Sequence, residues 1–210
     1  MTKHLRSFAL VLLIISLSTF AYSNVISFNS TGIGTNVKVL ESRDGYTKIE
    51  YTFNGYDAKE ININGKTYIS LAAPDMSWIM EKGNPQLLTF KKSLLIPDNS
   101  GMNYKILSQE TDVINTLPIM PSKGHFTRDI DPNSVPYTFG KIYISDKYFP
   151  ENNVALESPY IVRDYRGMTV QFNPIQYNAV QGKLKITKRI VIEIYSDNSK
   201  QVVNLSLIHI

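Results

Sequence analysis

Apolar and polar side chains alternate along much of this chain with the period of two that is typical of a β-strand with one wet face. In residues 48–53 every second side chain is isoleucine, tyrosine or phenylalanine, and those between them are lysine, glutamate and threonine. A similar pattern leads up to Asn64-Gly65, a dipeptide that accepts the positive φ angles of a two-residue type I′ turn. The pattern therefore predicts a strand over residues 48–53 and a hairpin over Glu60–Leu71.

The clearest strand lies near the C-terminal end of the chain. From Leu184 to Ile194 the even positions are apolar except for Lys188, whereas the odd positions include lysine, threonine, arginine and glutamate. A helix of period 3.6 would mix these two sets, so the pattern predicts a strand with one face in the core. A β-bulge at Lys188 would explain the interruption, as would an apolar stem lying over the core with its ammonium in water.

Other segments point to the same class of fold. Residues 102–106 and 168–172 also alternate, and only Ala73–Met80 suggests a helical turn, which would begin at Pro74-Asp75. Many short strands separated by Asn, Asp, Gly and Pro indicate an all-β fold, either a two-sheet sandwich or a barrel.

The first residues have the features of an export signal. Two cations precede an apolar run, Phe8–Ile15, and small residues follow at Ala21 and Ser23. This order is typical of a cleavable secretory signal, so we expect removal of residues 1–23, with a cut after Ser23 favoured over a cut after Ala21. A membrane anchor needs about 20 consecutive apolar residues, and hydroxyl side chains interrupt this run too early. No later segment predicts a membrane span.

Charge and cysteine content exclude two classes of function. Removal of residues 1–23 would take away Lys3 and Arg6 but no acid, leaving 20 basic and 18 acidic side chains. These charges are interleaved along the chain, whereas a nucleic-acid binder gathers its cations on one face, so we expect no nucleic-acid partner. The sequence contains no cysteine. An exported domain of this kind has no disulfides and no catalytic thiol of its own, and depends on a large core.

Side chains suited to catalysis are scarce. Only His125 among the histidines lies away from the chain ends, and one histidine predicts neither a metal centre nor a Ser-His-Asp triad. Asp129 and Asp131 stand beside Pro132, which predicts turn-forming residues rather than the paired carboxylates of a glycosidase. We expect no catalytic residue, no metal and no cofactor in this chain.

The segment from Pro121 to Asn178 carries an ordered series of short motifs. They are Pro121-Ser122-Lys123-Gly124 with Arg128 beyond it, Asp131-Pro132, Pro136-Tyr137, Phe139-Gly140, Phe149-Pro150, Ile161-Val162-Arg163-Asp164 with Arg166-Gly167, and Asn173-Pro174 with Gln176-Tyr177-Asn178. In this order they resemble the N-terminal propeptide of gingipain-type (C25 family) cysteine peptidases. Weaker similarity extends the resemblance to about residues 80–195. Leu88 departs from it, because the family tends to have a proline there.

The resemblance implies a two-sheet, jelly-roll-like β-sandwich over residues 24–200. Such a propeptide covers the active-site cleft of its own peptidase, keeps the precursor latent until it is cut away, and assists folding. The chain itself would then be no enzyme but the prodomain part of a zymogen, and its partner in cis would be the cysteine peptidase catalytic domain. We expect it to be monomeric, exported to the periplasm, and then located at the cell surface or outside the cell.

The resemblance also points to one loop residue. By the match over residues 121–128, Arg128 would enter the specificity pocket of the peptidase, with Lys123 as the alternative if the pocket prefers lysine. Gly124, His125, Phe126 and Thr127 complete the expected inhibitory loop. An arginine offers a planar, bidentate fork to a pocket carboxylate that lysine cannot copy.

Flanking prolines would limit the motion of this loop, and a broad interface around it would supply binding affinity. The loop would then inhibit the peptidase instead of only being cleaved by it. Maturation would cut after Arg128. In the alternative interpretation, Arg128 is an ordinary exposed loop arginine.

Two further points stay open at this stage. The aromatic residues allow an alternative function, an autonomous secreted module that binds carbohydrate or a surface, because carbohydrate-binding sandwiches use aromatic side chains. Residues 201–210 form an unassigned tail that could be one more strand or the end of a truncated precursor, since the expected catalytic domain does not follow Ile210.

Overall fold

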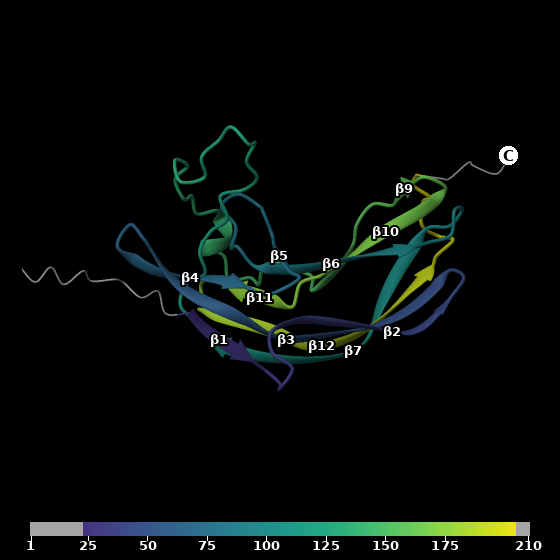
Figure 1. The fold of residues 1–210 in the computed structure, drawn as a ribbon, viewed down its shortest axis with the longest axis horizontal. Coiled ribbons are helices and arrows are strands. Elements are labelled where there is room, and N and C mark those ends of the chain that lie inside the picture. Colours follow the sequence, from purple (N-terminus) through teal and green to yellow (C-terminus); the bar gives the residue numbers. More distant parts are fainter. Residues whose placement is uncertain (1–22, 205–210) are drawn as a thin grey trace, which may run out of the picture.

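The computed structural model describes residues 23–204, and its strands form two antiparallel sheets (Figure 1). The larger sheet has seven strands: β1 (Ser23–Ser27), β2 (Gly34–Arg43), β3 (Tyr46–Ile63), β4 (Lys66–Ala72), β7 (Met102–Asn115), β11 (Ile175–Asn178) and β12 (Lys183–Ser196). The smaller sheet has five: β5 (Ser77–Trp78), β6 (Leu88–Leu95), β8 (Val154–Leu156), β9 (Tyr160–Val162) and β10 (Tyr165–Phe172). A 3-10 turn, η1, spans Lys141–Ile144. The predicted all-β sandwich is confirmed.

Strand β3 takes two sets of partners in succession. Residues 46–53 pair with β2 and β12, and residues 55–63 pair with β1 and β4. Gly55 lies where the partners change, with φ +147°, and a Cβ atom there would lie 2.1 Å from the carbonyl oxygen of Ile26. Only glycine fits this close approach. The changeover lets one long strand join both halves of the larger sheet.

The turn and the bulge expected from the sequence are both confirmed. Asn64 and Gly65 have φ angles of 52° and 81°, as a type I′ turn between β3 and β4 requires. The register between β12 and β7 shifts between Thr187 and Arg189, which places a bulge at Lys188. The Lys188 Nζ atom lies 2.5 Å from a carboxylate oxygen of Asp112. The bulge therefore carries the one cation of this face out of the core.

The helical turn expected over Ala73–Met80 is wrong. The chain makes a turn at Pro74-Asp75, where Asp75 has φ +60°, a left-handed conformation that cannot continue a right-handed helix. Strand β5 follows and pairs with β6. The Trp78 indole Nε1 donates a hydrogen bond of 2.6 Å to the Leu71 carbonyl, which fixes the segment against β4.

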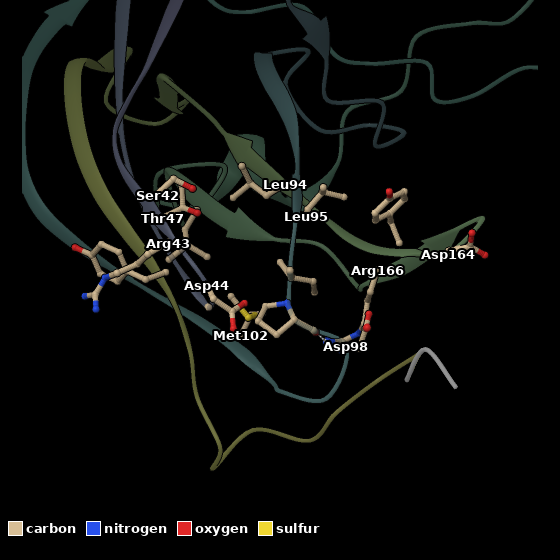
Figure 2. A pocket seen from close by; sticks show the side chains of 16 residues that line it. Ser42, Arg43, Asp44, Thr47, Leu94, Leu95, Asp98, Met102, Asp164 and Arg166 are labelled. Atoms are coloured by element: carbon tan, nitrogen blue, oxygen red, sulfur yellow. Dashed lines mark hydrogen bonds between the residues drawn. The ribbon is translucent and has the colours of Figure 1, made fainter. Parts of the chain in front are cut away.

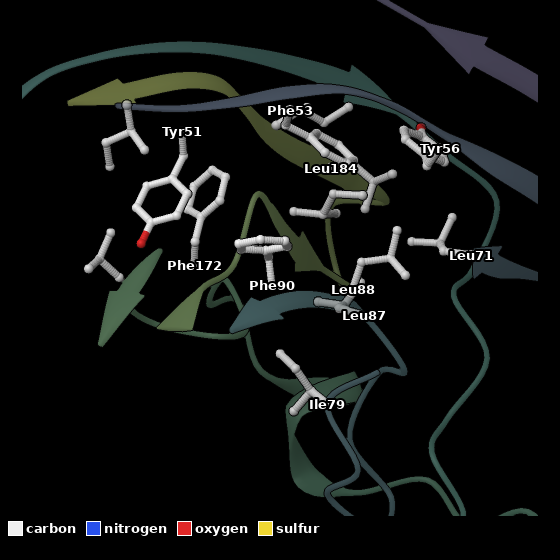
Figure 3. Packing of buried hydrophobic residues seen from close by; sticks show 14 of the residues in the cluster. Tyr51, Phe53, Tyr56, Leu71, Ile79, Leu87, Leu88, Phe90, Phe172 and Leu184 are labelled. Atoms are coloured by element: carbon white, nitrogen blue, oxygen red, sulfur yellow. The ribbon is translucent and has the colours of Figure 1, made fainter. Parts of the chain in front are cut away.

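Aromatic rings join the two sheets in the core (Figure 3). Tyr51 of β3 stacks on Phe172 of β10, with ring centroids 5.2 Å apart, and lies 6.0 Å from the ring of Phe90 on β6. Tyr51 and Phe172 have no exposed surface, and burial raises the pKa of the Tyr51 phenol. Each buried aromatic removes a large apolar area from water. The packing explains how a domain without cysteine holds two sheets together.

The chain ends are only partly described. Ser23, after which the signal cut was expected, is the first residue of β1; it pairs with Lys59, and its hydroxyl hydrogen-bonds to Asp57. Residues 1–22 lie outside the described part, so the signal peptide stays a prediction. Residues 201–204 form no strand, and residues 205–210 lie outside the description. No helix within residues 23–204 has the length and apolar character to cross a bilayer.

Arg166 is a buried cation that ties the end of the described chain to the sandwich. Its side chain is 1% exposed, and its guanidinium donates hydrogen bonds to the carbonyls of Pro97 (2.6 Å), Ser100 (2.8 Å), Val203 (2.7 Å) and Asn204 (3.0 Å). Burial lowers the pKa of Arg166, and the charge of Asp98 opposes this shift. Arg163, at the adjoining β9–β10 turn, has φ +55°.

We predict that Arg166→Met lowers the free energy of unfolding by about 3 kcal/mol, because it leaves buried carbonyls without donors. Arg163→Met, in the same hairpin but exposed, is the control and should change it by less than about 0.5 kcal/mol. Urea denaturation measures both. Equal stability of the two variants would contradict the role given to Arg166.

Candidate functional site

The residues predicted for the inhibitory loop all lie on one segment that stands away from the sheets. Residues 123–137, called the projecting loop from here on, leave the sandwich after Ser122 and return to it at Phe139. In Figure 1 this segment rises at the upper left, while the β9–β10 hairpin lies at the upper right. The loop contains no strand or helix. Its shape therefore depends on turns and on the contacts where it joins the sandwich.

Backbone hydrogen bonds between three chain segments form the loop base, defined here as residues 81–86, 118–122 and 139–143. The Gly83 N–H donates to the Ser122 carbonyl (2.8 Å), and the Ser122 N–H donates to the Asn84 carbonyl (2.8 Å). The Gly140 N–H donates to the Gly83 carbonyl (2.7 Å), and the Gln86 N–H donates to the Met120 carbonyl (2.9 Å). Ser122 is fully buried. Both ends of the loop are thus fixed to the same short segment.

Aromatic side chains close one side of the loop base. The ring centroids of Tyr68 and Phe139 lie 5.4 Å apart, and those of Phe139 and Tyr143 lie 5.0 Å apart. The Tyr143 hydroxyl donates to the Ile119 carbonyl (2.8 Å), and burial raises its pKa. Phe139 is exposed, but the three ring planes meet at 39° and 76°, so the rings do not form a flat platform. Their role is to support the base.

The first turn of the projecting loop carries Arg128. The Ile130 N–H donates to the Thr127 carbonyl (3.2 Å), so Arg128 and Asp129 occupy the middle of the turn. A hydrogen bond from the Thr127 hydroxyl holds the pKa of Asp129 below its ordinary value. Asp129 is therefore a turn residue, as predicted.

The second turn follows immediately. The Ser134 N–H donates to the Asp131 carbonyl (3.0 Å), and the Asn133 N–H donates to the Asp131 carboxylate (2.9 Å). The Ser134 hydroxyl also donates to the Asp131 carbonyl (2.7 Å). This confirms Asp131 as a turn former. The two turns give the loop a defined shape without regular secondary structure.

Arg128 and Lys123 have opposite surroundings. Arg128 is exposed, and within residues 23–204 its guanidinium has no hydrogen bond, ion pair or ring contact. Lys123 is half-buried; its Nζ donates to the Pro132 carbonyl (2.7 Å) and lies 4.3 Å from the centroid of the Tyr137 ring. Arg128 is available to a partner, whereas Lys123 is engaged within the loop.

The remaining predicted loop residues occupy the segment between these two cations. Gly124 is buried with φ +86°, and its N–H donates to the Ser122 hydroxyl (3.1 Å). His125 and Thr127 are exposed, and Phe126 is half-buried. Within residues 23–204, no group of three or more histidine or acidic side chains, with or without His125, is placed to hold a metal ion.

A hollow of about 510 Å³ opens at the other end of the molecule (Figure 2). It lies between the β2–β3 turn, the end of β6 and the β9–β10 hairpin, and Arg166 and Asp98 line it. The Arg166 guanidinium is already bonded to backbone carbonyls. The hollow does not include any residue of the projecting loop.

Comparison with known families decides the identity of the domain. A family model described as Propeptide_C25 matches residues 29–206. The chain belongs to the C25 propeptide family. The match begins well before the resemblance detected from the sequence, because it includes strands β2 to β4 as well as the motifs after residue 80.

The C25 propeptide is similar to parts of longer proteins from Porphyromonas gingivalis. It is 32% identical to gingipain R1 over 176 residues, which cover 83% of this chain and 18% of that protein. It is 29% identical to gingipain R2 of strain ATCC 33277 over 164 residues, which cover 78% of this chain and 22% of that protein. The chain thus spans less than a quarter of the length of each relative. What it shares with these proteins is the C25 propeptide alone.

Two solved structures share the fold of this C25 propeptide. The complex of Porphyromonas gingivalis RgpB pro- and mature domains matches with a TM-score of 0.73 and 28% identity, over 77% of this chain and 85% of that chain. A structure on the zymogenic latency of gingipain K from the same organism matches with a TM-score of 0.71 and 20% identity, over 84% of this chain and all of that chain. The second match shows the fold alone.

Sequence reasoning missed the residues that hold the loop of this C25 propeptide in place. Gly83 and Asn84 form the centre of the loop base, and Tyr143 braces it. The Gly-Asn-Pro sequence at residues 83–85 is a turn signal, but nothing in it indicates a partner near residue 122. The contact is visible only in three dimensions.

We predict that Gly124→Ala disturbs the loop base specifically. An alanine at φ +86° is strained, and its Cβ would lie 3.1 Å from the Cβ of Lys82. The free energy of unfolding should fall by about 1–2 kcal/mol, and amide exchange at Gly83 and Ser122 should accelerate. Gly65→Ala is the matched control, since φ is +81° there and no atom lies within 4 Å of the added Cβ. Unchanged exchange at Gly83 in both variants would refute this account.

Proposed function

We propose that this propeptide keeps a gingipain-type cysteine peptidase latent by placing Arg128 in the specificity pocket of the catalytic domain. The observation that carries the proposal is the exposed Arg128 side chain, which has no partner within residues 23–204 and sits in a hydrogen-bonded turn. A cation in this position can enter a pocket without first breaking contacts in its own domain.

Arginine is well suited to this task. Its planar fork makes two parallel charge-assisted hydrogen bonds to a carboxylate, a geometry that an ammonium group cannot reproduce. The surroundings also favour Arg128 over Lys123, because the Lys123 ammonium is already bonded to the Pro132 carbonyl and covered by Tyr137. Releasing Lys123 would cost both contacts. We therefore propose that Arg128, and not Lys123, enters the specificity pocket.

The rigidity of the loop base supports inhibition rather than simple cleavage. Docking a loop that already has its bound shape loses less conformational entropy than docking a mobile one. Two turns and the hydrogen bonds from residues 83–84 supply this order. One solved relative agrees with such a role, since the RgpB structure is a complex of pro- and mature domains.

Export and maturation follow in the same proposal. With the predicted signal at residues 1–23, the precursor is exported, folds with the propeptide in place, and reaches the cell surface or the exterior. A cut after Arg128 during maturation then opens the loop. The rings at the loop base meet at 39° and 76°, a geometry that does not favour the flat stacking surface of the alternative carbohydrate-binding module.

We expect Arg128→Ala to raise the inhibition constant of the chain from residue 24, measured against the catalytic domain of its own precursor, by about 100-fold. Arg128→Lys should give an intermediate value, because it keeps the charge but loses the fork. Arg163→Ala is the control, since Arg163 is exposed in the turn between β9 and β10, and in Figure 1 these strands lie on the other side of the molecule from the projecting loop. If Arg128→Ala inhibits as well as Arg163→Ala, Arg128 is not the pocket residue.

A further inference from the structure

The contacts of Lys123 span the tip of the projecting loop. Lys123 precedes Arg128 in the chain, whereas both of its partners follow Arg128: the Pro132 carbonyl, 2.7 Å from Nζ, and the Tyr137 ring, with its centroid 4.3 Å from Nζ. The Lys123 side chain thus connects the segment that leads to Arg128 with the segment that returns from it. The Arg128–Asp129 bond lies between the connected points.

We propose that Lys123 is a positioning residue that holds the Arg128–Asp129 peptide bond in an inhibitory pose and slows its cleavage. This inference rests on the proposed function, because it concerns how Arg128 is presented to the peptidase. This role of Lys123 differs from the one considered in the sequence analysis, in which Lys123 would enter the specificity pocket in place of Arg128. It acts through the loop and does not touch the partner's pocket.

The physical argument concerns the freedom of the loop. Without this contact the two turns would remain, but the segment that leads to Arg128 and the segment that returns from it would be joined only at the loop base. Fixing these two segments relative to each other on docking costs conformational entropy. The Lys123 ammonium closes a shorter ring with Pro132, and its position over the Tyr137 ring adds a cation–π attraction. The connection lowers the cost of docking and restricts movement of the peptide bond at the tip.

The same restriction separates an inhibitor from a substrate. Hydrolysis adds one water across the Arg128–Asp129 bond, leaving a carboxylate on Arg128 and an amino group on Asp129. Reaction needs the bond to reach an attack geometry, and the product ends must then move apart. A contact that joins residues on both sides of the bond opposes the separation. Loss of Lys123 should therefore weaken inhibition and accelerate cleavage at once.

Lys123→Met tests this inference, because methionine keeps an unbranched stem but has no ammonium. We expect the inhibition constant against the catalytic domain of the same precursor to rise about tenfold and the rate of cleavage after Arg128 to rise by a similar factor, about tenfold. Amide exchange in residues 124–136 should accelerate. The melting temperature should change by less than about 3 °C, since the contact lies outside the core.

Three further variants make the test specific. Lys123→Arg should restore slow cleavage, because a guanidinium can still donate to Pro132 and lie over Tyr137. Tyr137→Leu should have part of the effect of Lys123→Met, and the two changes combined should be less than additive. Lys82→Met is the control, since Lys82 is an exposed lysine beside Gly124 at the loop base, and it should behave as wild type.

The outcomes separate this inference from the proposed function. If Arg128→Ala loses potency while Lys123→Met inhibits and is cut like wild type, the positioning role is wrong and the pocket role stands. If Arg128→Ala keeps full potency, the proposed function itself fails. A Lys123→Met chain that unfolds would also overturn the inference, because Lys123 would then support the fold rather than the loop.

Discussion

The hydrogen bonds that Ser122 makes with the backbone of Gly83 and Asn84 join the projecting loop to the sandwich. Ser122 is fully buried, so these bonds are shielded from water, and breaking them would leave buried polar groups without partners. The return of the loop is tied to the same segment through Gly140. Everything beyond this junction, including the turn that carries Arg128, takes its position from it.

The sandwich supplies the rigid support for that junction without disulfides. β3 runs through both halves of the larger sheet, and its change of partners at Gly55 keeps them in one layer. The rings of Tyr51 and Phe172 then join the larger sheet to the smaller one. Because apolar burial is the dominant favourable term in folding, this core can hold the loop base in a domain that contains no cysteine.

The strands were predictable because a one-residue shift exchanges the two faces of a strand, so burial imposes a clear period of two. The bulge at Lys188 was also indicated by the sequence, because Lys188 is the one charged residue among the otherwise apolar even positions from Leu184 to Ile194. The segment after Ala73 was mispredicted because the φ of Asp75 depends on its tertiary setting. The exposed position of Arg128 suits the role implied by the family motifs. The contacts of Lys123, in contrast, could not be predicted from the sequence, because its partners are a backbone carbonyl and a ring whose positions are defined only in the folded loop.

The molecule fixes its two ends by different means, and the difference suits a propeptide. At one end Arg166 is buried and bonded to backbone carbonyls, so the residues near 203–204 are held as part of the domain. At the other end the loop is held at its base by backbone bonds and packed rings, and beyond the base by two turns and the contact of Lys123. A cut in the loop would therefore remove few core contacts, whereas loss of Arg166 would expose several buried groups. Cleavage at the loop can thus change binding while the sandwich stays folded.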